Sequence, residues 1–291
     1  MAASAIVRAV PLLNNSASAL LGLASAASWG AGDFCGGVAT KRAGSFPVVV
    51  GAHLVGLTGF ASLALLSGEA RPPLTNLLWC GVAGLCGVAG LLALYRALAV
   101  GRMGIAAPVS GVLSAAVPVA GGLFVDAPPG SAQWVGFVLA LAGVWLIART
   151  DDSRIDVRVL GLPLVAGLGI GLFIVVIGRA SGGAVLWPVV ASRVASLTVL
   201  SSIAALAGGG VLPRRADWGI VALVGLFDTG GNVLLVAAAR AGRLDVAGVL
   251  SSLYPASTVL LAWSLLGERL SRPQLAGLTA VLIAIVLITM P

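Results

Sequence analysis

Long apolar runs, broken at short polar intervals, dominate this chain. A membrane-spanning helix needs about 20 mostly apolar residues, and ten segments of this kind lie between charged or Pro/Gly-rich breaks. They are residues 17–39, 46–67, 74–98, 104–125, 131–148, 159–179, 186–207, 217–239, 245–266 and 272–290. The pattern therefore predicts an all-α polytopic membrane protein with ten transmembrane helices.

The two halves of the chain repeat at a shift of 141 residues. The superposed pairs include Phe46-Pro47 on Trp187-Pro188, Gly84 on Gly225, Gly101-Arg102 on Gly242-Arg243 and Ser110 on Ser251. The longest charged connection, residues 149–158, lies between the copies. We therefore expect one five-helix repeat in residues 1–150 and a second in residues 151–291.

An odd number of spans in each repeat has a geometric consequence. The second copy must enter the membrane with the opposite orientation to the first. Inverted repeats of this kind are a recurrent transporter architecture, with substrate held near the bilayer midplane where the repeats meet. The sequence thus predicts two inverted five-helix repeats around a central cavity.

Composition supports lipid as the main solvent. Of 291 residues 59% are hydrophobic and 9% are charged, with a mean hydropathy of +1.09, whereas soluble domains carry about 25% charged residues. The net charge of +7 comes from scattered basic residues, so we expect membrane lipid and no nucleic acid as a partner.

Cys35, Cys80 and Cys86 lie in apolar segments without metal-ligand spacing, so we expect no metal and no cofactor. Residues 1–16 indicate no removable signal peptide.

The basic residues in the loops predict an orientation of the chain in the membrane. The loops between spans 1–2, 3–4, 5–6, 7–8 and 9–10 carry 11 Lys or Arg, and the opposite side carries 5. Basic residues favour the cytoplasmic side, so this count predicts that both termini are outside the cytoplasm.

Three charged residues lie well inside predicted spans: Asp33, Arg193 and Asp228. A charge in hydrocarbon is costly, so an intramembrane ionisable residue is a functional candidate by default. Asp33 shares a helix face with Trp29, one turn earlier. This pair either lines a hydrated cavity, with the acid as a proton or cation site, or Asp33 is a solvated residue near the helix end at Lys41.

Asp228 and Asn232 are also one turn apart and lie near mid-bilayer. We interpret Asp228 as a titrating group, as a structural ion-pair partner of Arg193, or as both. Arg193 is then a counter-ion, an anchor for an anionic substrate group, or a side chain that reaches to the interface. His53, the sole histidine, is expected to hydrogen-bond within the bundle.

Other helices differ in character. Pro255 follows Ser251 and Tyr254 in the ninth span, so the two hydroxyls either face substrate at a helix break or flank a simple packing kink.

Glycines at 81, 84, 87 and 90 predict close packing of the third span. The fifth and tenth spans carry almost no polar group, which predicts that they are peripheral; the polar chemistry is expected on spans 1, 3, 4, 6, 8 and 9.

Several motifs resemble the EamA-type branch of the drug/metabolite transporter superfamily. They are Ser28-Trp29-Gly30, the run at 97–102, its counterpart at 238–243, and Leu266-Gly267-Glu268-Arg269 followed by Gln274 and Gly277. The resemblance covers nearly the whole chain. It implies a ten-helix basket with a central cavity, cytoplasmic termini, and Glu268 and Arg269 as loop residues that support structure. The first half departs from the pattern, because Asp126-Ala127-Pro128-Pro129 stands where the second half has Gly-Glu-Arg.

Together these observations predict a secondary transporter in the cell membrane, not an enzyme. We expect it to move a small organic solute (an amino acid, metabolite or drug-like compound) by alternating access, to be coupled to protons, and to act as a monomer or weak homodimer. The candidate substrate- or ion-binding residues are Trp29, Asp33, Arg193, Asp228, Asn232, Ser251 and Tyr254.

The alternative is a membrane-embedded enzyme acting on a lipid or lipid-linked substrate, although one histidine and two dispersed intramembrane acids provide few catalytic groups. No phosphate-binding GxxxxGK[ST] motif occurs, which excludes that class of ATP-driven pump.

Overall fold

The computed structural model describes residues 2–101, 103–122, 130–148, 160–207, 212–241, 247 and 250–288, with most side chains from residue 17 onward. Within these ranges the chain is helical and contains no strand. The helices are α1 (Ala2–Ala43), α2 (Ser45–Ser67), α3 (Leu74–Val100), α4 (Met103–Gly122), α5 (Ser131–Ala148), α6 (Gly161–Ala180), α7 (Leu186–Ala207), the 3-10 turn η2 (Arg215–Asp217), α8 (Trp218–Ala241), α10 (Tyr254–Leu266) and α11 (Arg272–Ile288). The predicted boundary at residues 149–158 lies outside the described ranges.

Most predicted spans agree with these bounds to within a few residues, and two do not. The first helix begins before residue 17 and continues to Ala43, so Lys41 and Arg42 form its last turn and not a loop. The ninth predicted span, 245–266, is not one continuous helix. Residues 252 and 253 form a turn, and α10 begins at Tyr254 because Pro255 fits the first helical turn but cannot continue a preceding helix.

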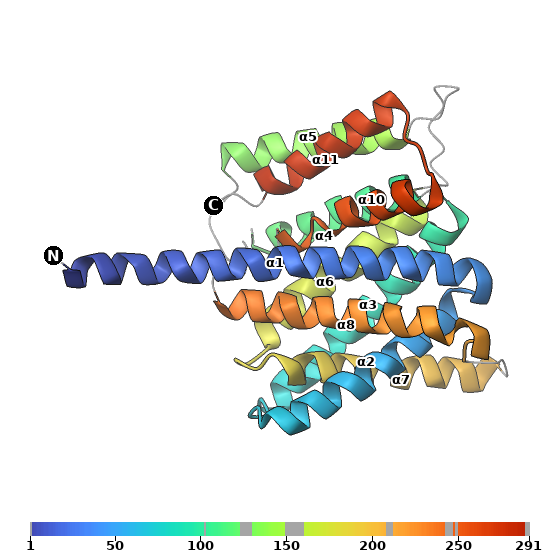
Figure 1. The fold of residues 1–291 in the computed structure, drawn as a ribbon, viewed down its shortest axis with the longest axis horizontal. Coiled ribbons are helices and arrows are strands. Elements are labelled where there is room, and N and C mark those ends of the chain that lie inside the picture. Colours follow the sequence, from blue (N-terminus) through green and yellow to red (C-terminus); the bar gives the residue numbers. More distant parts are fainter. Residues whose placement is uncertain are drawn as a thin grey trace.

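Tight connections allow neighbouring helices to run antiparallel. Gly44 alone separates α1 from α2, and its φ of 83° lies in the left-handed region that glycine adopts without strain. Gly267 ends α10 in the same way with a φ of 66°. The start of α1 and the end of α11 lie at the same end of the bundle (Figure 1).

Two glutamates show that counterpart helices of the two halves run in opposite directions. Glu69, just beyond the end of α2, accepts hydrogen bonds from backbone N–H groups at the start of α7, at 2.7 Å from Val185, the residue before the helix, and 2.9 Å from Leu186. Because α2 and α7 are the superposed helices of the repeat, the end of one lying at the start of the other makes the pair antiparallel. At the opposite end of the bundle (Figure 1), Glu268 beyond α10 likewise accepts from the N–H of Gly104 at the start of α4, at 3.3 Å.

These carboxylates also explain how two helix N-termini are stabilised. A helix N-terminus carries unpaired N–H groups and a partial positive charge that favours an anion. Trp187 strengthens the contact at Glu69, since its indole N–H donates to the Glu69 carbonyl at 2.9 Å and its ring lies 4.6 Å from the Arg71 guanidinium carbon. Glu268 therefore has the structural role that the family resemblance implied.

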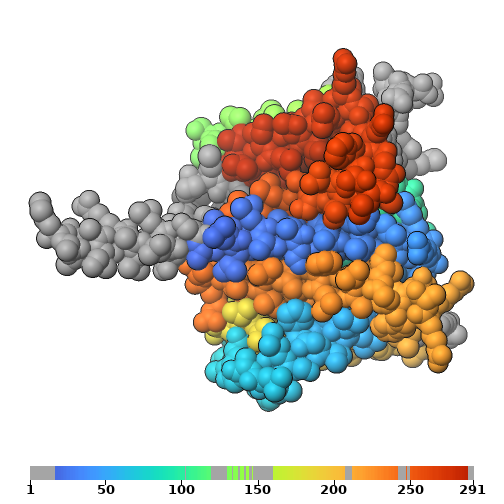
Figure 2. Space-filling model, viewed as in Figure 1, coloured from blue at the N-terminus to red at the C-terminus, as the bar shows by residue number. Residues whose placement is uncertain are grey.

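The two halves interleave and do not form separate bundles. The most extensive helix contacts join α1 to α8 and α3 to α6, and contacts between the halves also join α3 to α7 and α2 to α8. The sequence repeat equates α1 with α6, α2 with α7 and α3 with α8. The α1–α8 contact is therefore the counterpart of the α3–α6 contact, and the α2–α8 contact is the counterpart of the α3–α7 contact, so the packing follows the repeat. Figure 2 shows the result on one face, where α1 and α2 of the first half alternate with α8 and α10 of the second.

Glycines permit the closest of these contacts. A Cβ atom at Gly84 of α3 would collide with the backbone of Ser192 in α7, and one at its counterpart Gly225 in α8 would collide with the backbone of Ala52 in α2. A Cβ at Gly90 would lie 2.9 Å from the carbonyl oxygen of Ala166. The prediction that the third span packs closely through small residues is confirmed.

The periphery is apolar. Helices α5 and α11 pack on each other and reach the rest of the bundle mainly through α4, and Figure 1 shows them together at one edge, as their composition predicted. Five described helices are long and apolar enough to cross a membrane: α2, α3, α6, α7 and α8 with its preceding turn. Large apolar side chains such as Leu66, Leu206 and Trp263 point outward, as expected for a surface that faces lipid.

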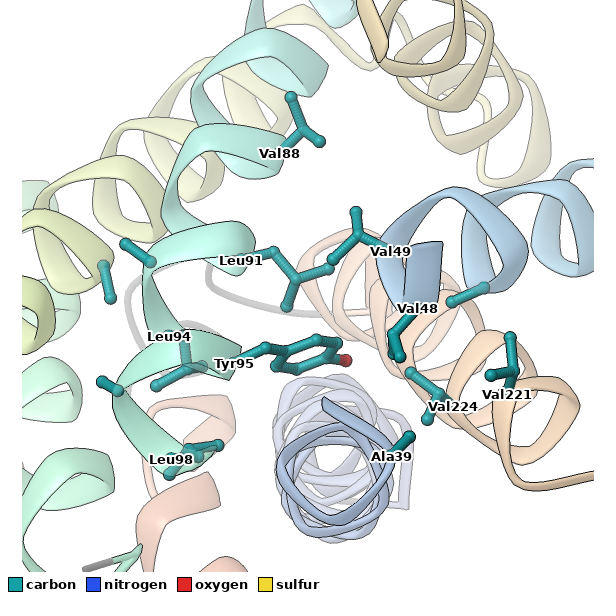
Figure 3. Packing of buried hydrophobic residues seen from close by; sticks show 14 of the residues in the cluster. Ala39, Val48, Val49, Val88, Leu91, Leu94, Tyr95, Leu98, Val221 and Val224 are labelled. Carbon is teal, nitrogen blue, oxygen red and sulfur yellow. The ribbon is translucent and has the colours of Figure 1, made fainter. Parts of the chain in front are cut away.

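The largest core cluster takes most of its residues from α2 and α3 and also includes residues of α1, α4, α6, α7, α8 and α10. Tyr95 of α3 lies against α1, where its ring occupies the space that a side chain at Gly36 would need. Figure 3 shows this ring between Leu94 on α3 and Val48 and Val49 on α2. The cluster fixes α1 relative to α3, and so fixes the residues of α1 that face the centre of the protein.

Candidate functional site

A cavity lies where α1 and α8 meet α3 and α6. Ten of the described residues, from six helices, line it: Trp29, Asp33, Gly87, Leu91, Ile170, Phe173, Arg193, Asp228, Asn232 and Tyr254. All three charged residues predicted to lie inside spans are among them. They are also deeply buried, with exposed fractions of 6% for Asp33, 4% for Arg193 and 9% for Asp228.

Arg193 is held by three neighbours. Its Nη2 donates to Asp228 Oδ2 at 2.5 Å, its Nε to Thr229 Oγ1 at 3.4 Å, and its Nη1 to His53 Nε2 at 3.0 Å. A guanidinium has no acceptor, so His53 Nε2 must accept and the ring proton must lie on Nδ1. Of the interpretations left open by the sequence, the structure shows the Arg193–Asp228 ion pair and excludes an Arg193 side chain that reaches to the interface. His53 hydrogen-bonds within the bundle, as predicted.

Two aromatic residues connect the polar groups. The indole Nε1 of Trp29 donates to Asn232 Oδ1 at 3.1 Å and to the Asp228 carbonyl at 3.2 Å. Its ring meets the ring of Tyr254 edge to face, with centroids 6.2 Å apart. The Tyr254 hydroxyl in turn shares a hydrogen bond of 3.0 Å with Ser110 of α4. Trp29 therefore fixes the side chain of Asn232, and Ser110 of α4 fixes the hydroxyl of Tyr254.

Asp33 differs from the other charged residues. It is not a solvated residue at a helix end, because α1 continues for ten more residues and its side chain is buried. The turn that carries it packs on α8, since a Cβ at Gly32 would lie 3.2 Å from the Asp228 amide nitrogen. In the described part of the chain no hydrogen bond or ion pair involves the Asp33 carboxylate, although it lines the cavity.

The lining residues follow the internal repeat. Three pairs are separated by 141 residues: Trp29 and Ile170, Gly87 and Asp228, Leu91 and Asn232. In each pair one member is polar or aromatic and the other is apolar or glycine. Consequently α3 and α6 give the cavity an apolar side, and α1, α7, α8 and α10 give it a polar side. A cavity of this kind suits an amphipathic solute.

The cavity is narrow in this conformation. The cavity has a volume of about 40 Å³, and one buried water needs roughly 10–15 Å³ of such volume. The space therefore accommodates about three waters, and a larger solute requires the helices to separate.

The structure brings together six of the seven residues proposed from the sequence. Ser251 does not line this cavity; its hydroxyl is buried and donates to the Gly22 carbonyl at 3.4 Å. Sequence reasoning missed the apolar side, formed by Leu91, Ile170 and Phe173. The signal was present in the repeat, because Ile170 and Leu91 are the counterparts of Trp29 and Asn232.

Metal or cofactor chemistry has few candidate ligands here. Across the residues that the structure describes, no group of three or more His, Cys, Asp or Glu side chains lies close enough to hold a metal ion. Asp33 and Asp228 are the acids of the cavity, and Arg193 already binds Asp228.

Comparison with known proteins agrees with the fold. Twenty-six solved chains match this one, among them a structure described only as "Crystal structure of protein", which has 16% sequence identity and a TM-score of 0.68 over 94% of this chain and 96% of its own. That similarity shows a shared fold. A search of curated proteins finds no sequence match.

A family model gives the more specific result. The model of the EamA-like transporter family matches the chain twice, over residues 16–149 and over residues 158–290. The two matches together cover most of the sequence, and they confirm the resemblance carried by the Trp-Gly and Gly-Glu-Arg motifs. This chain, an integral membrane protein built from a repeated helical unit, belongs to the EamA-like transporter family.

Proposed function

We propose that this chain is a secondary transporter of the cell membrane, with ten spans, that moves a small organic solute by alternating access. The solute is an amino acid, a metabolite or a drug-like compound. The observation that carries the proposal is the position of the cavity: its lining comes from equivalent positions of both repeats, at the interface where inverted repeats hold their substrates. The moving units are the halves 1–150 and 151–291.

The arrangement of the helices supports alternating access. Counterpart helices run antiparallel, and the two halves contact each other at both ends of the bundle, through Glu69 at one end and Glu268 at the other. A rocking motion that opens one end while the other stays closed would expose the cavity to each side in turn. The narrow cavity corresponds to a conformation in which both contacts are closed.

We further propose that transport is coupled to protons through Asp33 or Asp228. Both acids line the cavity. The charged or titratable groups near Asp228 are Arg193, Asp33 and Tyr95, and His53 lies beyond Arg193. Protonation of Asp228 would release Arg193 from its ion pair, and protonation of Asp33 would remove an uncompensated charge.

Solute flux in proteoliposomes with an imposed pH gradient tests these proposals. Solutes are first chosen from a metabolite panel by the thermal stabilisation of the purified protein. Protein-dependent flux that responds to the gradient supports the transporter and its coupling. If Asp228→Asn and Asp33→Asn each transport like the wild type at every pH, the coupling role is lost. Turnover of a lipid in detergent, without a sealed compartment, would instead support an enzyme.

A further inference from the structure

The charges of the cavity do not balance. Among the described residues that line the cavity, Arg193 is the one basic residue, and its guanidinium is bound to Asp228, Thr229 and His53. Asp228 and Arg193 thus compensate each other within the protein. Asp33 remains as a buried carboxylate for which the described residues provide no partner, and burying an unpaired charge is costly.

The groups around this carboxylate favour a cation. Trp29 lies one turn from Asp33 on α1, and Tyr254 packs edge to face against Trp29. The Trp29 N–H is occupied by Asn232 and the Asp228 carbonyl, so its ring, and not its donor, is available to a ligand. Aromatic faces attract organic ammonium groups, and tryptophan does so most strongly.

The opposite side of the cavity constrains the rest of the ligand. Leu91 of α3, with Ile170 and Phe173 of α6, offers no hydrogen-bonding side-chain group. A ligand that fills the cavity therefore needs an apolar body as well as a charged group. An anionic ligand would meet the unpaired Asp33 and would have to displace Asp228 from Arg193.

We infer that the cavity binds a small monovalent organic cation with an apolar body, whose ammonium group pairs with Asp33 beside the Trp29 and Tyr254 rings. This inference rests on the proposed function in one respect only, namely that this cavity is the solute site. It narrows the substrate class from organic solutes in general to amines and quaternary ammonium compounds.

Binding to the purified full-length protein in detergent tests the inference, with three probes of matched shape: phenethylammonium, 2-phenylethanol and phenylacetate. We expect calorimetry to give phenethylammonium an affinity about tenfold or more above that of the neutral alcohol, and phenylacetate the weakest binding. Asp33→Asn should abolish the preference for the cation over the alcohol.

A matched control separates the charge of Asp33 from a general effect of the substitution. Asp217 is a similarly buried acid in η2, just before α8 and outside the cavity lining, so Asp217→Asn should keep the wild-type preference. Asp33→Glu, which retains the charge, should keep a preference for the cation. If Asp33→Asn does not fold, the order of the three probes on the wild type decides the matter.

The outcomes also separate this inference from the proposed function. Equal or tighter binding of phenylacetate, or an unchanged cation preference in Asp33→Asn, overturns the cation site even if the protein transports another solute. Selective cation binding without flux in proteoliposomes keeps the cation site and overturns the transporter.

Discussion

The ion pair between Arg193 and Asp228 is the residue-scale feature on which the site depends. It was one of several interpretations open from the sequence, since the two residues lie on successive helices at a distance along the chain that fixes no contact. The structure decides in favour of a pair, because α7 and α8 place both side chains on the cavity and His53 and Thr229 fill the other sides of the guanidinium. A charged side chain that is paired and hydrogen-bonded can be buried within the membrane at a lower cost in free energy than a charged side chain without a partner.

Removing one partner of this pair should destabilise the protein more than removing both. Arg193→Met or Asp228→Leu alone leaves a buried charge without compensation, which typically costs about 3–5 kcal/mol, whereas an apolar pair of similar volume is often neutral. We expect each single variant to lower the thermal unfolding midpoint in detergent and the double variant to recover most of the loss. A double variant less stable than either single variant would contradict a pairwise interaction.

At the scale of helices, close approach through glycine determines which elements pack. The four glycines of α3 look alike in the sequence, but the structure distinguishes them. Gly84 and Gly90 face the backbones of α7 and α6, whereas a Cβ at Gly81 would meet only the Ala195 Cβ at 3.4 Å, an ordinary contact. The spacing of the glycines predicted a packing helix but could not say which glycine touches a neighbouring backbone.

The same substitution at two of these positions should therefore have different effects. Gly84→Ala forces α3 away from the Ser192 backbone, so we expect a loss of about 1–3 kcal/mol, the usual range for overpacking. Gly81→Ala should be neutral or slightly stabilising, because alanine is the better helix former. Fluorescence-detected size exclusion after heating compares the two variants; similar melting behaviour for both would be evidence against the α3–α7 contact.

A second element-scale prediction concerns the contacts of Glu69 and Glu268 with helix N-termini. Each joins the two halves at one end of the bundle, so each must break when that end opens. We expect Glu69→Gln to raise the labelling rate of a cavity cysteine, Leu91→Cys, from one side of the membrane about tenfold, because hydrogen bonds to a charged acceptor contribute roughly 1.5–3 kcal/mol. Glu268→Gln should raise the rate from the other side.

The experiment uses a background in which Cys35, Cys80 and Cys86 are replaced by alanine, and a membrane-impermeant thiol reagent applied to either face. The two glutamate variants serve as controls for each other. An increase from the same side in both variants would mean that the contacts do not act as opposite ends of one mechanism.

At the scale of the whole molecule, the repeat and its antiparallel counterparts predict opposite insertion of the two halves. Leu74, at the start of α3, and Arg215, at the start of η2, are repeat equivalents and both are exposed. In the same cysteine-free background, Leu74→Cys and Arg215→Cys should be labelled from opposite sides of the membrane. Labelling of both from one side would rule out inverted repeats, and with them the rocking motion.

The same experiment resolves the orientation of the termini. The count of basic residues predicts termini outside the cytoplasm, and the family resemblance implies termini inside. Because the start of α1 and the end of α11 lie at one end of the bundle, the side from which Leu74→Cys reacts also assigns the side of both termini.

The sequence alone determined the properties that depend on composition and period. Apolar runs long enough to span a bilayer, the shift of 141 residues and the three intramembrane charges could all be read directly, since lipid as a solvent constrains each segment locally. Only the tertiary structure decided which of these groups meet. Helix rotation and crossing determine that Arg193 pairs with Asp228 while Asp33 has no partner among the described residues. They also determine that α3 and α6 form the apolar side of the cavity and that Ser251 does not line it. Rotation and crossing are set by side-chain packing between segments far apart in the chain, which no local pattern specifies.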